Sequence, residues 1–278
     1  MKLPLRDRTV EREGPWIMGI LNTTPDSFSD GGNYLRPEAA LRQAEALVQA
    51  GADIIDVGGE STRPGSAGVS LEEEMDRVLP VVERIRENFD TLISVDTTKA
   101  ELARAAIEEA GANLINDISA LRFDERMGET VARLRAPVVL MHMKGTPGTM
   151  QQAPEYTDVV REVQEFLAER IESALAAGIS REKLILDPGF GFGKRLEDNL
   201  ALLRRLAEFR VWELPLLVGL SRKTFLGKIT GEERPAGREI ETVTAGVLAT
   251  LAGADILRVH DVLAASKALA VLRAVRGG

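Results

Sequence analysis

Polar and ionisable side chains follow eight short apolar runs of this sequence, at the point where each run ends. In chain order these groups are Asn22, Asp56 with residues 60–63, Asp96, Asn116 with Asp117, His142 with Met143, Asp187, residues 221–223, and Arg258 with His260. If the runs are parallel strands, their ends meet at one face and these side chains lie together. Carboxylates, an amide and a lysine in one place would suit a flat, polar heterocycle with adjacent N–H groups.

The last apolar run ends in Arg258 and His260, which are separated by one valine. Side chains two positions apart point to the same side of an extended chain, so both donors could meet one ligand. Phosphate sites in α/β barrels favour the loops after the seventh and eighth strands, and an anion is therefore expected here. His260 could instead be a structural histidine, and for His142 a structural and a functional role remain equally open.

Lys223 follows the seventh apolar run and could act in two ways. It could form a Schiff base with a carbonyl substrate, or it could supply a hydrogen-bond donor and a positive charge. A merely solvated lysine is disfavoured there, because the dipole at the start of a helix repels a cation. Asp96 also has two interpretations, as an enclosed ligand-binding carboxylate or as the N-cap of the next helix.

Three loops contain many glycines. Residues 19–32 form a long polar loop, and residues 56–65 form a second one in which Arg63 could bind an anion with two hydrogen bonds. The first of these two loops could be a mobile lid or a solvated surface loop. Residues 187–195 resemble a phosphate-binding loop, but their spacing fits neither the Walker pattern nor the dinucleotide fingerprint.

The elements that must position these groups alternate between short apolar strands and longer amphipathic helices. We predict strands over 16–21, 53–57, 91–95, 113–116, 137–141, 183–186, 215–219 and 255–259. We predict helices over 37–50, 71–88, 99–110, 124–135, 156–177, 196–207, 240–252 and 262–275, several of which end at a glycine. Eight strand–helix units without a linker predict a single (β/α)8 TIM barrel over residues 1–278, with its site at the C-terminal face of the strands. A doubly wound open sheet is the alternative fold.

Composition excludes several classes of site and partner. The chain has no cysteine and two histidines, so a disulfide framework, a thiolate metal site and a multi-histidine metal centre are excluded. Its net charge of −8 disfavours binding to nucleic acid or to an anionic membrane. No apolar run is long enough to span a bilayer, and the first residues lack the apolar centre of a signal peptide. We therefore expect a soluble, cytoplasmic protein.

Six segments together resemble the signature segments of dihydropteroate synthases. They are residues 18–32, 53–65, 94–98 with 113–119, 187–194, 219–227 and 258–261, and the similarity extends in order from about Pro15 to the end. The resemblance implies a folate-pathway transferase on a (β/α)8 barrel. Such an enzyme joins 4-aminobenzoate to 6-hydroxymethyl-7,8-dihydropterin diphosphate and releases 7,8-dihydropteroate and pyrophosphate.

The resemblance also implies roles for individual residues. The pterin pocket would comprise Asp96, Asn116, Met143, Asp187, Gly219 and Lys223, with Arg258 stacked over the ring. Asn22 would hold Mg²⁺ and the diphosphate, and the diphosphate would also be bound by Arg63, Arg258 and His260. The aminobenzoate site would be formed by Phe28, Thr62, Pro64, Phe192 and Thr224. Arg63, Lys223, Arg258 and His260 would be the catalytic residues. Thr23 and Thr224 depart from the usual Val and Ser of the family, but Thr224 keeps the hydroxyl.

The implied chemistry places most of the developing charge on the leaving diphosphate, where cationic donors and a divalent ion would stabilise it. The resemblance implies an SN1-like path, and closure of loops 23–35 and 61–69 would keep water from the electrophile. The alternatives are a pterin-binding methyltransferase that uses methyltetrahydrofolate, a Schiff-base aldolase, and a barrel that only binds pterins. The apolar helices from Ile240 and Val262, together with the resemblance, predict a homodimer.

Overall fold

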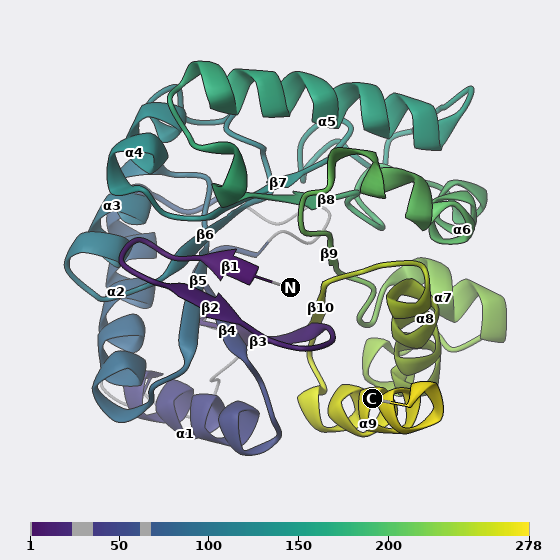
Figure 1. Cartoon of the computed structure of the whole chain (residues 1–278), viewed down its shortest axis with the longest axis horizontal. Helices are drawn as coiled ribbons and strands as arrows, with labels where there is room; N and C mark the ends of the chain where they lie inside the picture. Colours follow the sequence, from purple (N-terminus) through teal and green to yellow (C-terminus); the bar gives the residue numbers. More distant parts are fainter. Residues whose placement is uncertain (1, 24–35, 62–67, 278) are drawn as a thin grey trace.

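The computed structural model describes residues 2–23, 36–61 and 68–277. Eight parallel strands form one sheet in the order β8-β7-β6-β5-β4-β3-β10-β9. A parallel bridge between Leu186 and Leu216 joins the two ends of this order, so the sheet curls into a barrel. Helices surround the sheet in Figure 1. The predicted (β/α)8 barrel is confirmed, and the open doubly wound sheet is wrong.

The barrel strands form where the sequence predicts them, usually shifted by one residue. Because each is apolar on consecutive positions, it can be covered on both faces, by the barrel interior and by the helices. The strand from the seventh run is the exception, since only Leu217–Val218 of the predicted 215–219 pair in the ladder. The strands are β3 (Trp16–Asn22), β4 (Ile54–Gly58), β5 (Leu92–Asp96), β6 (Leu114–Asp117), β7 (Val138–Met141), β8 (Leu184–Asp187), β9 (Leu217–Val218) and β10 (Ile256–Val259).

The α-helices of the described residues are α1 (Arg36–Gln49), α2 (Leu71–Asn88), α3 (Ala100–Glu108), α4 (Met127–Leu134), α5 (Val159–Ala176), α6 (Leu196–Arg204), α7 (Thr224–Thr230), α8 (Glu239–Leu251) and α9 (Val262–Arg276). The predicted glycine stops are confirmed, since Gly51, Gly111, Gly178 and Gly253 all have positive φ. Helix α7 was not predicted from the sequence. This helix is short and contains Gly227, so it carries almost no helical periodicity.

Two apolar layers build the barrel, because successive strand residues point to opposite faces. Ile17 and Leu21 of β3 pack outward among the helices. Trp16 and Met18 of the same strand point inward, into a cluster with residues such as Ile54. This alternation fills the barrel interior, so substrates are confined to its ends.

A short N-terminal hairpin, β1 (Lys2–Pro4) and β2 (Thr9–Glu11), covers the end of the barrel where the strands begin. Its Leu3 and Leu5 join the interior cluster. Lys183 Nζ donates to the carbonyl oxygens of Pro4 (2.9 Å) and Leu5 (2.6 Å), which ties the hairpin to the start of β8. This hairpin was not predicted from the sequence. It leaves the opposite end of the barrel as the place for a site.

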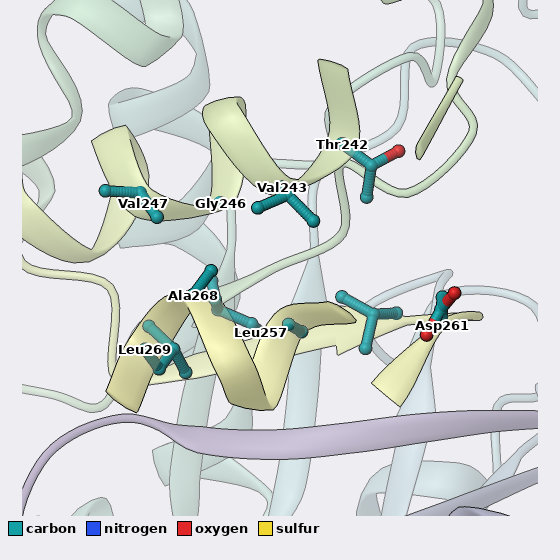
Figure 2. Close-up of a pocket in the computed structure, with 10 residues that line it drawn as sticks. Thr242, Val243, Gly246, Val247, Leu257, Asp261, Ala268 and Leu269 are labelled. Carbon is teal, nitrogen blue, oxygen red and sulfur yellow. The ribbon is translucent and has the colours of Figure 1, made fainter. Parts of the chain in front are cut away.

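A small hollow lies between α8 and α9, and Figure 2 shows the side chains around it. Its lining is mostly apolar and includes Val243, Leu257 and Leu269. A volume of about 10 Å³ matches a single water molecule, so this hollow is too small for a heterocycle. Within the described ranges, none of the helices combines the length and apolar character needed to cross a membrane.

Candidate active site

Arg258 lies between two carboxylates at the C-terminal ends of the strands. Its Nε donates to Asp56 Oδ2 (2.6 Å) and its Nη2 donates to Asp96 Oδ2 (2.9 Å). Asn116 Nδ2 donates to the same Asp56 oxygen (3.0 Å). Strands β4, β5, β6 and β10 therefore contribute to one polar network, as the strand-end pattern predicts. Asp96 faces this network rather than the start of α3, where Asp124 accepts from Ala100 N–H, so its interpretation as an N-cap is wrong.

Burial shifts the titration of the acids in this network. Desolvation raises the pKa of Asp96 to about 7, against the opposing effect of Arg258 and with a smaller push from Asp56. Desolvation likewise raises the pKa of Asp187 to about 6, although Gly189 N–H and the positive charge of Lys223 oppose it. Carboxyls that titrate close to neutral pH are typical of functional sites in clefts.

Lys223 occupies the N-cap position of α7 and points back toward the barrel acids. Desolvation lowers its pKa to about 8, as does the positive charge of Arg258, while Asp187 and Asp96 raise it. Its Nζ lies 4.1 Å from the centre of the Phe192 ring, a cation–π contact. The structure thus brings together Lys223, Asp187 and Phe192, three of the predicted substrate-binding residues.

His260 and Ser221 form the link between the last two strand ends. Ser221 Oγ lies 2.9 Å from His260 Nδ1 and accepts from His260 N–H (3.1 Å). Thr224, at the first position of α7, is exposed. Gly219 borders open space, since a Cβ built there would meet no atom within 4 Å among the described residues. These positions surround Lys223 from the side of β9 and β10.

Asn22 ends β3 beside Gly58 and Asp96. A Cβ built on Gly58 would lie 3.9 Å from Asn22 Oδ1 and 3.8 Å from Asp96 Oδ2, so both oxygens flank the same spot. The neighbouring Thr23 is buried, and its hydroxyl donates to the Gly58 carbonyl oxygen (3.2 Å). With glycine at position 58, no side chain fills the space between these two oxygens.

Met143 is buried in a small apolar cluster with Ile118, Met141 and Met150, against which Phe192 packs. This cluster gives the polar pocket one apolar wall. Phe28, Thr62, Arg63 and Pro64, and with them most of loops 23–35 and 61–69, lie outside the described residues.

Two buried residues near the site were not identified as site residues from the sequence. Asp56 lies in the middle of β4, and nothing in the sequence shows that it pairs with Arg258, 202 positions away. Lys194 was seen only as part of a loop that resembles a phosphate site, yet its Nζ is 2.8 Å from His142 Nδ1. That contact, together with the burial of both side chains, favours the structural role of His142.

Comparison with known proteins identifies the family to which this chain is similar. The family described as pterin binding enzyme matches residues 18–260. The chain is 49% identical to the dihydropteroate synthase of Escherichia coli K12, over 99% of this chain and 96% of that one.

The chain belongs to the dihydropteroate synthase family.

Solved structures of dihydropteroate synthases agree with this assignment. The Xanthomonas albilineans enzyme with 4-aminobenzoic acid has a TM-score of 0.92 and 48% identity, and covers 99% of this chain and 98% of its own. The same organism's enzyme in complex with 7,8-dihydropteroate has a TM-score of 0.91 and 46% identity over 100% of both chains. The protein is accordingly an enzyme, a transferase of a pterin-methyl group that acts in folate biosynthesis. These relatives are synthases, not methyltransferases or aldolases.

Proposed function

We propose that the protein condenses 6-hydroxymethyl-7,8-dihydropterin diphosphate with 4-aminobenzoate. The bond between the pterin methylene carbon and the diphosphate oxygen breaks, and a bond from the amine nitrogen to that carbon forms. The amine proton is released, and the products are 7,8-dihydropteroate and pyrophosphate. Relatives crystallised with 4-aminobenzoic acid and with 7,8-dihydropteroate support this assignment of substrate and product.

The observation that carries the proposal is the mixed polar lining of the barrel mouth. Asp96, Asn116 and Asp187 supply acceptors from strands β5, β6 and β8, and Lys223 supplies a donor. This set complements the ring N–H groups and acceptors of a pterin, with Met143 and Gly219 bordering the ring. In the free protein Arg258 bridges Asp56 and Asp96, and its flat guanidinium is available to stack on a bound ring.

Charge stabilisation at the leaving group is the main catalytic task. Arg258 and His260 end the same strand, and with Arg63 they would donate hydrogen bonds to the departing diphosphate. The arylamine is neutral at pH 7 and needs no side-chain base to become nucleophilic. Phe28, Thr62, Pro64, Phe192 and Thr224 would hold the aminobenzoate, with Thr224 at the start of α7 near its carboxylate.

Asn22 fits a Mg²⁺ ion that is bound mainly by the substrate. Its amide oxygen and Asp96 Oδ2 flank the space above Gly58, and oxygen ligands are those that Mg²⁺ prefers. The described residues contain no cluster of three or more acidic or histidine ligands that could hold a metal alone, which suits an ion coordinated largely by phosphate and water. When bound, Mg²⁺ would neutralise part of the diphosphate charge.

The arrangement of acids favours an SN1-like path. Asp96 and Asp187 are enclosed beside the pterin position, so their negative charge would stabilise a pterin-methyl cation. Direct displacement would place less positive charge on the pterin and would gain less from these two carboxylates.

A turnover assay tests the proposed reaction. The protein is incubated with the pterin diphosphate, Mg²⁺ and increasing 4-aminobenzoate, and pyrophosphate and 7,8-dihydropteroate are measured together. We expect both products to form in equal amounts and to depend on the amine. Multiple-turnover release of pyrophosphate that ignores 4-aminobenzoate would contradict the proposal. Borohydride trapping of a carbonyl substrate on Lys223 would instead support an aldolase.

The proposed assembly is a homodimer formed through α8 and α9. These two helices leave large apolar side chains in solvent, which suits a second copy of the chain. The side chains are Ile240, Leu248, Leu251, Leu263, Val271 and Val275, each between 48% and 81% exposed.

A further inference from the structure

The loop that follows β8 looks like a phosphate-binding loop in sequence, but its lysine turns inward. Lys194 is only 4% exposed. Its Nζ donates to the carbonyl oxygens of Gly189 (2.8 Å) and Phe192 (3.1 Å), and it lies 2.8 Å from His142 Nδ1. Three acceptors satisfy all three hydrogens of the ammonium group. The residue therefore ties two points of loop 188–193 to the end of β7.

Burial of this ammonium carries a cost. Desolvation lowers the pKa of Lys194 to about 7, with Asp187 opposing and Lys223 adding to the effect. Desolvation and the nearby Lys194 also lower the pKa of His142, so its ring stays neutral and can accept a hydrogen bond at Nδ1. An apolar side chain of similar length would fill the same space without this cost. The cost indicates that Lys194 is kept for its geometry.

The loop held by Lys194 forms one side of the substrate pocket. Phe192 places its ring 4.1 Å from Lys223 Nζ. The backbone at Gly191 packs on the stem of Lys223, since a Cβ built there would lie 3.0 Å from Lys223 Cδ. A shift of the loop would move the aromatic ring and the lysine relative to each other.

Other contacts fasten the loop at Gly191 and Gly193. Gln151 Nε2 donates to Gly191 O (2.8 Å), Tyr156 OH donates to Gly193 O (2.8 Å), and Gly191 N–H donates to Asn199 Oδ1 (2.7 Å). Lys194 is the side chain that binds the carbonyl of Phe192 itself.

We propose that Lys194 is a positioning residue, which fixes loop 188–193 so that Phe192 lies against Lys223 and forms a wall of the aminobenzoate site. This inference rests on the proposed function, because it assigns Phe192 to the site of the second substrate. Among the pterin-binding residues, Asp96 and Asn116 are held by strands β5 and β6, whereas Asp187 accepts from Gly189 N–H of this loop and Lys223 contacts Phe192. Because Asp187 itself lies on strand β8, loss of Lys194 should affect the amine more than the pterin.

The test compares Lys194→Met with Arg195→Met, the same substitution at the next residue. Arg195 is exposed, and its side chain donates to the Asp198 carboxylate. We expect Lys194→Met to raise the KM for 4-aminobenzoate about tenfold, the effect of losing roughly one well-formed hydrogen bond. The dissociation constant of the pterin diphosphate, measured by calorimetry, should rise by a clearly smaller factor, about threefold or less. Arg195→Met should leave both values unchanged.

Two other outcomes would overturn the inference. Equal weakening of pterin and amine binding would show a general structural role, and an unchanged KM for 4-aminobenzoate would show that the loop holds without Lys194. Folding is checked by circular dichroism, and if Lys194→Met is not folded, Lys194→Leu, which also lacks N–H donors, is judged by the same two outcomes. Turnover of the wild type is measured first, so its absence would refute the proposed reaction rather than the role of Lys194.

Discussion

Asp56 and Asp96 share Arg258, and the two carboxylates lie close enough for the charge of Asp56 to raise the pKa of Asp96. Asp56 is completely buried, and its Oδ1 has no hydrogen-bond partner among the described residues. Its negative charge raises the pKa of Asp96, in addition to the larger effect of desolvation. The ionised form of Asp96 is the better acceptor for ring N–H groups, so pterin affinity should fall as the pH drops through about 7.

Asp56→Asn should move this midpoint to lower pH. The substitution keeps the shape of the side chain and removes the negative charge that disfavours ionised Asp96. As the pH falls from 8 to about 5, we expect pterin affinity to decrease less in the variant than in the wild type. Calorimetric titrations over this range measure it, and a constant difference would show that Asp56 and Asp96 are not coupled.

Lys223→Met should abolish tight pterin binding and at the same time stabilise the free protein at neutral pH. The pKa of Lys223 is lowered to about 8 in the folded state, below its value in the unfolded chain. The resulting penalty is fully present below pH 8 and disappears as the pH rises toward that of a free lysine, about 10.4. Thermal unfolding at several pH values should show a gain in Tm that shrinks above pH 8. A gain that is independent of pH would not come from the lysine charge.

The sequence identifies the residues at the strand ends because each ends an apolar run. It does not identify the pairing of Arg258 with Asp56 and Asp96, since these contacts form only when the barrel closes. Lys194 was missed because a lysine in a glycine-rich loop looks solvent-exposed, and its burial depends on acceptors from three other residues.

The loop after β8 depends on a glycine that has no room for a side chain. Gly189 has a φ of +69°, and a Cβ there would collide with the carbonyl oxygen of His142. Gly231, which ends α7, has a φ of +83° but no atom within 4 Å of the Cβ position. Both glycines have a left-handed backbone conformation, but only Gly231 has room for a side chain.

Alanine at these two glycines separates backbone strain from collision. Gly231→Ala should cost about 1 kcal/mol of unfolding free energy, the price of a left-handed alanine. Gly189→Ala should cost roughly 3 kcal/mol or more and should raise the KM for 4-aminobenzoate, because the loop must shift. Urea denaturation and steady-state kinetics measure both effects. Equal losses of stability would mean that the loop moves aside without cost.

Elements with strong patterns were predictable, and those made by tertiary contacts were not. Helix α2 has the predicted bounds because its apolar stripe is regular and Ser70 caps its start by accepting from Glu73 N–H. The hairpin of β1 and β2 has strands of three residues, and it is stabilised by packing into the barrel and by Lys183 rather than by its own pattern.

At the scale of the whole molecule, the proposed dimer depends on the apolar surface of α8 and α9. Leu248→Lys places a charge in the middle of this surface and should shift the protein from dimer to monomer, because a buried lysine without a partner is costly. Phe123→Lys is the control, since Phe123 is 44% exposed just before α4, a helix far from α8 and α9 (Figure 1). Sedimentation of both variants and the wild type measures the assembly. An unchanged dimer in Leu248→Lys would place the interface elsewhere.

The net charge of −8 gives a misleading impression of the ligand, because charge is distributed unevenly. Arg258 and Lys223 lie at the barrel mouth beside acids that burial partly neutralises, so the local balance differs from the global one. The net charge of the whole chain therefore argues against extended anionic partners such as nucleic acid, but it does not argue against the binding of a small anion.

The hairpin at the closed end of the barrel gives the molecule a built-in orientation. Because β1 is pinned to that end by Lys183, a tether or fusion partner attached ahead of Lys2 would emerge from the side opposite the substrate pocket. Enzyme coupled to a bead or a sensor surface through this point would present its open end to the solution. The same hairpin that seals the core would then act as a mounting point that keeps the catalytic end free.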